Sequence, residues 1–144
     1  MKDSTKKRLP LFIVSVITLI LECLPYGVVL NFATGEYGAE TIRMTYSYFS
    51  LTPFGYATFG PLPAAVLTCV VTLLTLIYIF RPSTGLKSTA GVMSIVAAVL
   101  SISPIIFGFD FITVIGVIVT LLLIAEGILF LRPRMKKSYY EEGL

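Results

Sequence analysis

Long apolar runs separated by short polar breaks dominate the residue pattern of this chain. The last run, 88–131, is too long for one crossing of a bilayer, and Pro104, Gly108 and Asp110 mark a turn inside it. A helix needs about 20 apolar residues to cross the hydrocarbon core. The pattern therefore predicts an all-α bundle of four transmembrane helices in a single membrane domain, 1–144, with helices at 9–30, 62–80, 88–107 and 111–131.

The ends of these expected helices carry start signals. Pro61 and Pro63 suit the first turn of the second helix, where a backbone N–H has no partner within the helix. Ser88 or Thr89 is the expected N-cap of the third helix, and Asp110 that of the fourth, because short polar side chains can accept hydrogen bonds from the first free N–H groups.

Composition supports a membrane protein and argues against an enzyme. Hydrophobic residues make up 56% of the chain and charged residues only 13%, unlike a soluble domain. The chain has no histidine, no nucleophile elbow and no phosphate-binding glycine loop. Cys23 and Cys69 lie in apolar runs without a nearby metal-ligand partner, and whether they form a disulfide stays open. We expect no catalytic residue, metal or cofactor.

The positive charges are distributed unevenly along the chain. Ten of the eleven lysines and arginines lie in the N-terminal segment, the 81–87 loop or the tail, 132–144, and only Arg43 lies in the long connection 31–60. Positively charged short loops stay on the cytoplasmic side of a membrane. We therefore expect a multi-pass plasma-membrane protein with both termini in the cytoplasm, a retained first helix and an extracytoplasmic loop at 31–60. The bilayer is the expected partner, and nothing indicates nucleic acid.

The loop 31–60 is rich in aromatic residues and poor in charge, so we expect it to fold against the membrane. Residues 41–49 alternate between apolar or aromatic and polar side chains, which predicts a short β-strand or hairpin element. The stretch 34–38 has the composition of a turn. The partner of the strand is either the short stretch before Gly35 or another subunit, since an exposed edge favours pairing.

Two interpretations of the loop aromatics follow from their chemistry. Tyrosines and phenylalanines form belts at membrane interfaces, where the ring lies in the apolar layer and the hydroxyl reaches water. Alternatively, they form a recognition surface for a protein, a peptide or a cationic ligand, because rigid aromatic rings supply contact area at low entropic cost. The residues that we assign to this external surface are Tyr46, Tyr48, Phe54 and Tyr56.

Glu22 is the most informative residue of the apolar runs. An ionisable group in hydrocarbon costs several kcal/mol, so it faces the bundle interior or belongs to a functional site. Pro25 is expected to bend the first helix and free a backbone carbonyl beside Glu22. Counting equal depths along the other helices predicts one intramembrane polar site, whose members are Glu22, Tyr26, Thr68 and Ser101.

Glu126 lies five residues before the end of the fourth expected helix. At that depth its side chain can reach the headgroups or meet Arg81 or Lys87, so we expect a structural ion pair or a carboxyl extended toward the surface. The helical rise separates Glu126 from Glu22 by ~12 Å along the membrane normal, which argues against a paired-carboxylate site.

Two segments give the chain a resemblance to known proteins. Leu21-Glu22-Cys23-Leu24-Pro25-Tyr26-Gly27 and Leu51-Thr52-Pro53-Phe54-Gly55-Tyr56 resemble segments of uncharacterised four-span proteins of Gram-positive gut bacteria, a likeness that implies no function. The layout, with a long first and a short second external loop, is similar to that of claudin-type tetraspan proteins. It departs from them because their external tryptophan and cysteine pair are missing.

Two functional hypotheses follow. The first, which we prefer on sequence, is a structural or accessory membrane component whose aromatic loop binds a partner, either another membrane protein or a second copy of the chain. The alternative is a small oligomeric transporter that exchanges protons for cationic compounds through Glu22. In span count and in a first-helix glutamate the chain is similar to small multidrug resistance exporters, but its long loop and the motif around Glu22 differ from theirs.

Overall fold

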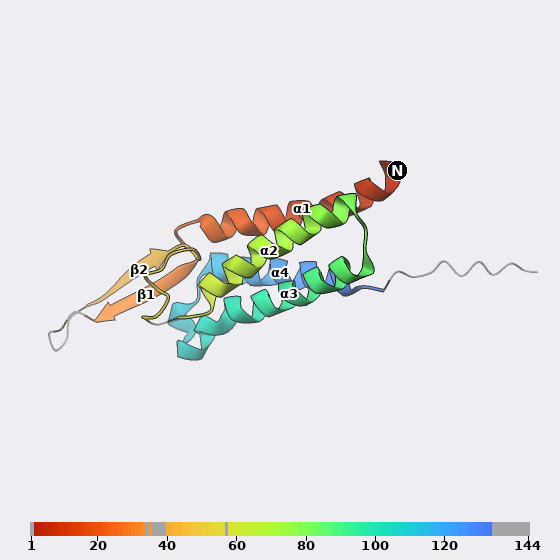
Figure 1. Cartoon of the computed structure of the whole chain (residues 1–144). Coiled ribbons are helices and arrows are strands. Elements are labelled where there is room, and N and C mark those ends of the chain that lie inside the picture. The colour runs from red at the N-terminus through yellow and green to blue at the C-terminus, as the bar shows by residue number, and fades with distance from the viewer. Residues whose placement is uncertain (1, 34, 36–39, 57, 134–144) are drawn as a thin grey trace, which may run out of the picture.

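The computed structural model describes residues 2–33, 35, 40–56 and 58–133, with side chains from residue 5 onward. It is mostly helical, with four long helices and one small antiparallel sheet (Figure 1). The elements are α1 (Lys2–Cys23), β1 (Val28–Ala33), β2 (Thr41–Tyr46), α2 (Pro61–Phe80), α3 (Thr84–Ile102) and α4 (Val114–Leu131), with 3₁₀ turns at Ser103–Phe107 and Phe109–Phe111.

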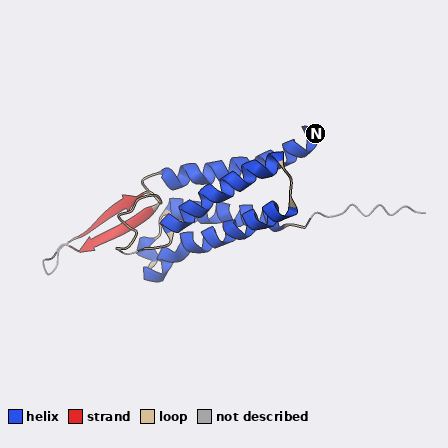
Figure 2. Ribbon diagram, in the orientation of Figure 1, coloured by secondary structure: helices blue, strands red, loops and turns tan. Residues whose placement is uncertain are grey.

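The four helices form an antiparallel bundle, and the two strands project from one end of it (Figures 1 and 2). Each helix contacts the next one along the chain, and α1 also contacts α4, so the bundle closes on itself. The start of α1, the connection between α2 and α3, and the end of α4 lie together at the end opposite the strands. We call these two ends of the bundle the hairpin end and the basic end.

The first helix differs from its expected bounds. It begins at Lys2, within the basic segment, and ends at Cys23 instead of reaching residue 30. Pro25 lies in the turn that follows, so the expected bend inside a longer helix is wrong. The reason is local, because a proline disfavours helix in the residue before it, and the β-branched Val28 and Val29 suit a strand.

The expected strand is confirmed, and its partner is the stretch before Gly35. β1 and β2 pair antiparallel in a register that places Val28 opposite Tyr46 and Ala33 opposite Thr41. β2 ends at Tyr46, three residues earlier than the alternation suggested. The turn expected at 34–38 falls, apart from Gly35, outside the residues that the structure describes.

Two of the expected helix caps are wrong. α3 begins at Thr84 with Ser83 as its N-cap residue, four residues before the expected start at 88. Asp110 lies in a 3₁₀ turn, and Thr113 caps α4 instead, accepting a hydrogen bond from the Gly116 N–H at 2.8 Å. The turn between the third and fourth helices lies where the polar pattern predicts it. Two 3₁₀ turns lengthen this connection, so the N-cap of α4 lies three residues later than expected.

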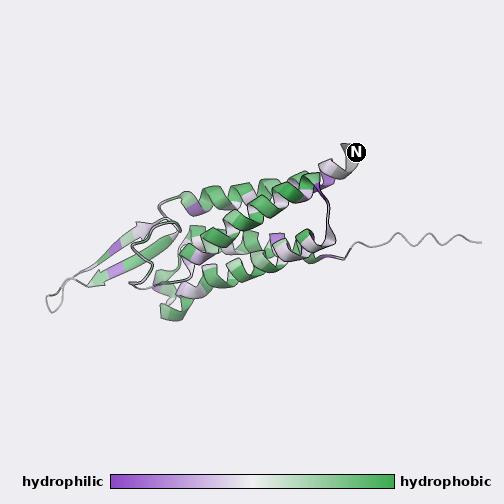
Figure 3. Ribbon diagram, viewed as in Figure 1, coloured by the Kyte–Doolittle hydropathy of each residue, from purple (hydrophilic) through white to green (hydrophobic). Residues whose placement is uncertain are grey.

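The bundle has an apolar outside and carries its buried polar groups inside. Large apolar side chains are exposed along every helix. Apolar residues predominate along the helices of the bundle (Figure 3). Within the described part of the chain, three helical segments are long and apolar enough to cross a membrane, namely Pro61–Phe80, Thr84–Phe107 and Val114–Leu131. α1 carries more charge, because it includes the basic start and Glu22. This distribution is that of a multi-pass membrane protein.

Candidate functional site

The polar groups buried inside the helix bundle form the candidate site. Two carboxyl groups and several hydroxyls are fully enclosed, although the outer surface of the same helices is apolar. Ser15, Thr18 and Glu22 lie three and four residues apart on α1, which places them on one face of that helix. We use the name interior polar file for five buried residues: Ser15, Thr18, Glu22, Thr68 and Glu126.

Glu22 forms the part of the file nearest the hairpin end. Its side chain is completely buried, and its Oε1 accepts a hydrogen bond from the Thr68 hydroxyl at 2.8 Å. The same hydroxyl lies 3.0 Å from the carbonyl of Ala64, and its one proton can serve only one of these acceptors at a time. Among the described residues, Glu22 Oε2 has no hydrogen-bond partner. A proton on Glu22 would let the carboxyl donate to Thr68 instead.

Glu126 occupies the other part of the file and does not behave as the sequence suggested. Its side chain is completely buried and hydrogen-bonded to the Ser15 hydroxyl, and its Oε2 has no partner in the described part of the chain. Lys87 instead donates to the carbonyl of Arg132 at 2.6 Å. The expected ion pair or surface-directed carboxyl is therefore wrong, because Glu126 lies on the same inward face of α4 as Leu123 and Phe130.

The two carboxyl groups are separated by about two turns of α1. Ser15, which contacts Glu126, precedes Glu22 by seven residues, a rise of ~10 Å. Thr18 lies between them and is completely buried, with its hydroxyl donating to the Val14 carbonyl at 2.9 Å. The file therefore has a carboxyl group at each end, each bonded to a hydroxyl, and Thr18 lies between the two pairs along α1.

The expected four-residue polar layer is only partly assembled. The structure brings Glu22 and Thr68 into contact, but the Tyr26 side chain is 59% exposed in the turn after α1. Ser101 belongs to a separate cluster, in which its hydroxyl lies 2.7 Å from the Tyr48 hydroxyl and 2.8 Å from that of Thr120. Residues at equal depth along their helices are therefore not all in contact. Ser101 contacts the hydroxyl of Tyr48, a residue outside the predicted layer.

Tyr48 links the hairpin end to the bundle interior. Its ring is 1% exposed, and its backbone N–H donates to the Glu22 carbonyl at 3.0 Å. Burial raises the pKa of Tyr48 to about 12, so its hydroxyl stays protonated near neutral pH. The assignment of Tyr48 to an external recognition surface is therefore wrong, because strand alternation ends at Tyr46 and the chain then turns inward.

The other residues of the expected recognition surface lie at the hairpin end. Tyr46 is partly buried, whereas Phe54 and Tyr56 are exposed. Tyr56 stacks at a tilt on Phe32 with 6.2 Å between ring centroids, and Phe54 meets Phe59 edge-on at 5.7 Å. Three of the four residues thus remain at least partly accessible, and two of them, Phe54 and Tyr56, belong to ring pairs.

Replacing Tyr48 with phenylalanine should destabilise the fold by about 1 to 2 kcal/mol, because the buried hydroxyl cluster loses one member while the ring still fills its place. Thermal unfolding of the purified protein in detergent measures the effect. Tyr56→Phe is the matched control, because the Tyr56 side chain is 80% exposed and its change should lie within about 0.5 kcal/mol. Equal unfolding temperatures for wild type and Tyr48→Phe would contradict the assigned role.

Neither a metal site nor a similar known protein indicates what the interior polar file does. No cluster of three or more histidine, cysteine or acidic residues able to hold a metal occurs among the described residues. Cys23 and Cys69 are both free thiols. No family model, curated protein or solved structure matches the chain, so its likeness to four-span bacterial proteins stays a prediction.

Proposed function

We propose that the protein crosses the plasma membrane four times and conducts protons through the interior polar file. The observation that carries the proposal is the pair of completely buried glutamates, each with one oxygen bonded to a hydroxyl and the other without a partner among the described residues. An unpaired carboxylate in hydrocarbon is costly, and intramembrane acids belong to proton relays in many transporters. A proton on each carboxyl would remove that cost.

α1 is proposed as the fourth membrane span although its composition is less apolar. The helix has 22 residues, but the part after its basic start, 9–23, is only ~22 Å long, so the proposal requires the long basic side chains of the first turns to extend to the headgroups while their backbone helps to span the ~30 Å hydrocarbon core. It contacts both α2 and α4, and its outward side chains Leu9, Ile13 and Ile17 are exposed as those of the other helices are. Its charges lie at the basic end or face the bundle interior, so they do not oppose a crossing.

The orientation proposed for the bundle places the basic end in the cytoplasm. Arg8 donates to the Ile79 carbonyl near the end of α2, Arg81 follows α2, and Lys87 donates to the Arg132 carbonyl after α4. All four therefore lie at the basic end, which the positive-inside rule assigns to the cytoplasmic side. Reporter fusions after Lys87 and after Thr45 measure the sidedness, and we expect cytoplasmic and external signals respectively. The reverse pattern, or the same side for both, would contradict the four-span arrangement.

A route for protons requires access to the file from outside the bundle. A small cavity of about 40 Å³ at the hairpin end is lined by Tyr48, Ser101 and Thr120, among others, which is room for about one water molecule. Tyr48 donates its backbone N–H to the Glu22 carbonyl, although the Glu22 carboxyl does not line this cavity. The proposal therefore requires a water molecule to carry a proton between the hydroxyl cluster and the Glu22 carboxyl.

The proposal is tested by proton movement in vesicles that contain the purified protein. Wild type should dissipate an imposed pH gradient faster than protein-free vesicles, and Glu22→Gln should not. Gradient loss at the protein-free rate with wild type, after full incorporation has been verified, would reject proton conduction.

A second candidate function is partner binding through the exposed aromatic pairs at the hairpin end. The observation in its favour is that Phe54, Tyr56 and Phe59 are all exposed while contacting other rings. Such a surface offers rigid contact area, although an interfacial belt has the same composition. If the vesicle assay detects no proton movement, partner binding becomes the better hypothesis.

A further inference from the structure

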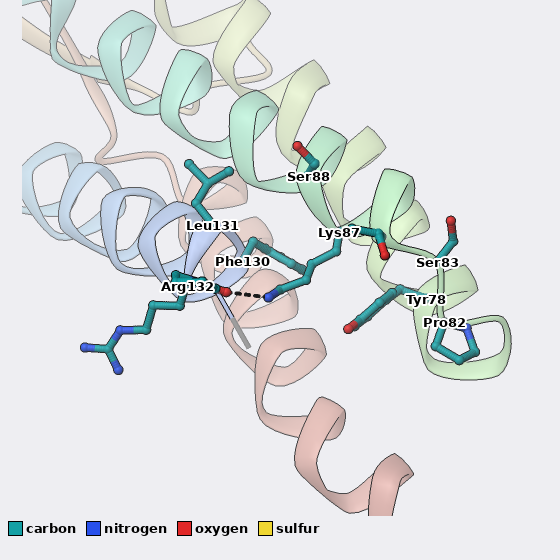
Figure 4. Close-up of a pocket in the computed structure, with 10 residues that line it drawn as sticks. Tyr78, Pro82, Ser83, Lys87, Ser88, Phe130, Leu131 and Arg132 are labelled. Atoms are coloured by element: carbon teal, nitrogen blue, oxygen red, sulfur yellow. Dashed lines mark hydrogen bonds between the residues drawn. The ribbon is translucent and has the colours of Figure 1, made fainter. Parts of the chain in front are cut away.

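A large cavity lies at the basic end, away from the interior polar file. Its volume is about 390 Å³, in the range of small-molecule sites. The connection between α2 and α3 forms one side, and the end of α4 forms the other (Figure 4). The lining residues are Tyr78, Pro82, Ser83, Thr84, Lys87, Ser88, Phe130, Leu131, Arg132 and Pro133.

The charge and donor groups of this cavity suit an anion. Lys87 supplies a positive charge, and no acidic residue is among those that line the cavity. Its ammonium group has three hydrogens, of which one is donated to the Arg132 carbonyl at 2.6 Å (Figure 4). Two donors therefore remain for a ligand. Ser83, Thr84 and Ser88, which carry hydroxyl groups, are also among the lining residues.

The floor of the cavity is aromatic and holds a second positive charge behind it. Tyr78 and Phe130 meet edge-on with 6.2 Å between their ring centroids, and both are buried. The Arg8 guanidinium lies 5.2 Å from the centre of the Tyr78 ring and donates to the Ile79 carbonyl at 3.4 Å. Arg8 thus strengthens the positive potential near the cavity. The guanidinium of Arg132 extends away from it (Figure 4).

We propose that this cavity binds the phosphate group of an anionic membrane lipid. The cavity lies where the apolar helices α2 and α4 end, since Leu131, which lines it, is 46% exposed and Phe80, the last residue of α2, is 78% exposed. A lipid whose acyl chains cover those side chains would place its phosphate at the level of Lys87. A phosphate ion free in solution offers the same headgroup chemistry without the acyl contact, and it is distinguished by experiment.

The test compares an anionic and a zwitterionic phospholipid, which share the phosphate and the acyl chains and differ in the group attached to the phosphate. Full-length protein in detergent is titrated with phosphatidylglycerol or phosphatidylcholine of equal acyl chains, and bound lipid is counted by native mass spectrometry. We expect phosphatidylglycerol to bind preferentially and Lys87→Gln to weaken it about fivefold, the effect of losing one positive charge near a lipid surface. Lys87→Arg should retain binding, and Lys6→Gln, an exposed lysine outside the cavity, is the matched control.

Three outcomes would overturn the proposal. Equal binding of the two lipids would show that charge plays no part, and full binding by a correctly folded Lys87→Gln would place the lipid elsewhere. Competition by inorganic phosphate at concentrations similar to those of the lipid would assign the cavity to a soluble anion instead. Proton movement in vesicles is measured separately, so failure here does not affect the proton proposal.

Discussion

Replacing Gly60 with alanine is expected to lower the stability of the bundle by about 2 to 3 kcal/mol, the upper part of the range for overpacked cores. Gly60 precedes α2, and a Cβ there would lie far inside van der Waals contact with the Leu100 carbonyl and the Ser103 hydroxyl. The carbonyl belongs to backbone at the end of α3, so it cannot rotate away as a side chain could. Thermal unfolding in detergent should show a decrease of roughly 10 °C.

Gly85→Ala provides the matched control for this substitution. Gly85 lies in the first turn of α3, where an added Cβ would make only an ordinary 3.7 Å contact with the Ser83 hydroxyl. Alanine favours helix over glycine by up to about 1 kcal/mol, so this variant should be as stable as wild type or slightly more so. A Gly60→Ala protein that unfolds at the wild-type temperature would contradict the close packing of α2 against α3.

Glu22→Gln and Glu126→Gln are each expected to reduce proton movement to the rate of protein-free vesicles. Glutamine keeps the shape of glutamate, and its carbonyl can still accept the hydroxyl of Thr68 or Ser15, but it cannot take up a proton at neutral pH. Because the two carboxyls are proposed to act in series, the double variant should lose no more than either single variant. Dissipation of a pH gradient, followed with a dye inside the vesicles, measures all three.

Glu40→Gln is the control for the glutamate series. It makes the same chemical change at an exposed residue just before β2, outside the bundle interior, and should leave the rate unchanged. Unfolding temperatures of all variants must match closely enough to exclude loss of the fold. Wild-type rates in either single variant, or additive partial losses, would contradict two carboxyls acting in series.

Part of the fold follows directly from the sequence. The lengths of the apolar runs locate three helical stretches to within a few residues: α2, residues 88–102 of α3, and α4. The alternation of polar and apolar residues locates β2. The end of α1 could not be placed in the same way, because the apolar run continues through Pro25 into β1 without a change in hydropathy. Hydropathy alone does not distinguish an apolar strand from an apolar helix.

The candidate site was less accessible to sequence reasoning. Counting equal depth along the helices places Glu22 and Thr68 together, and the structure shows that contact. Glu126 was misplaced because its depth suggested the membrane surface. The signal that could have found it is rotational, since Val119, Leu123 and Phe130 share its face of α4 and are buried with it. The prediction for Tyr48 depended on where β2 ends, because the chain turns inward after the strand. Alternation of polar and apolar residues locates that end only to within several residues.

The most direct test of proton conduction is the rate at which wild-type protein dissipates a pH gradient across sealed vesicles, with a potassium ionophore present to prevent a membrane potential. The proposed account predicts that the rate increases in proportion to the amount of protein per vesicle and falls to the protein-free level in the Glu22→Gln, Glu126→Gln double variant. A rate independent of protein amount, or equal in wild type and double variant, would contradict it.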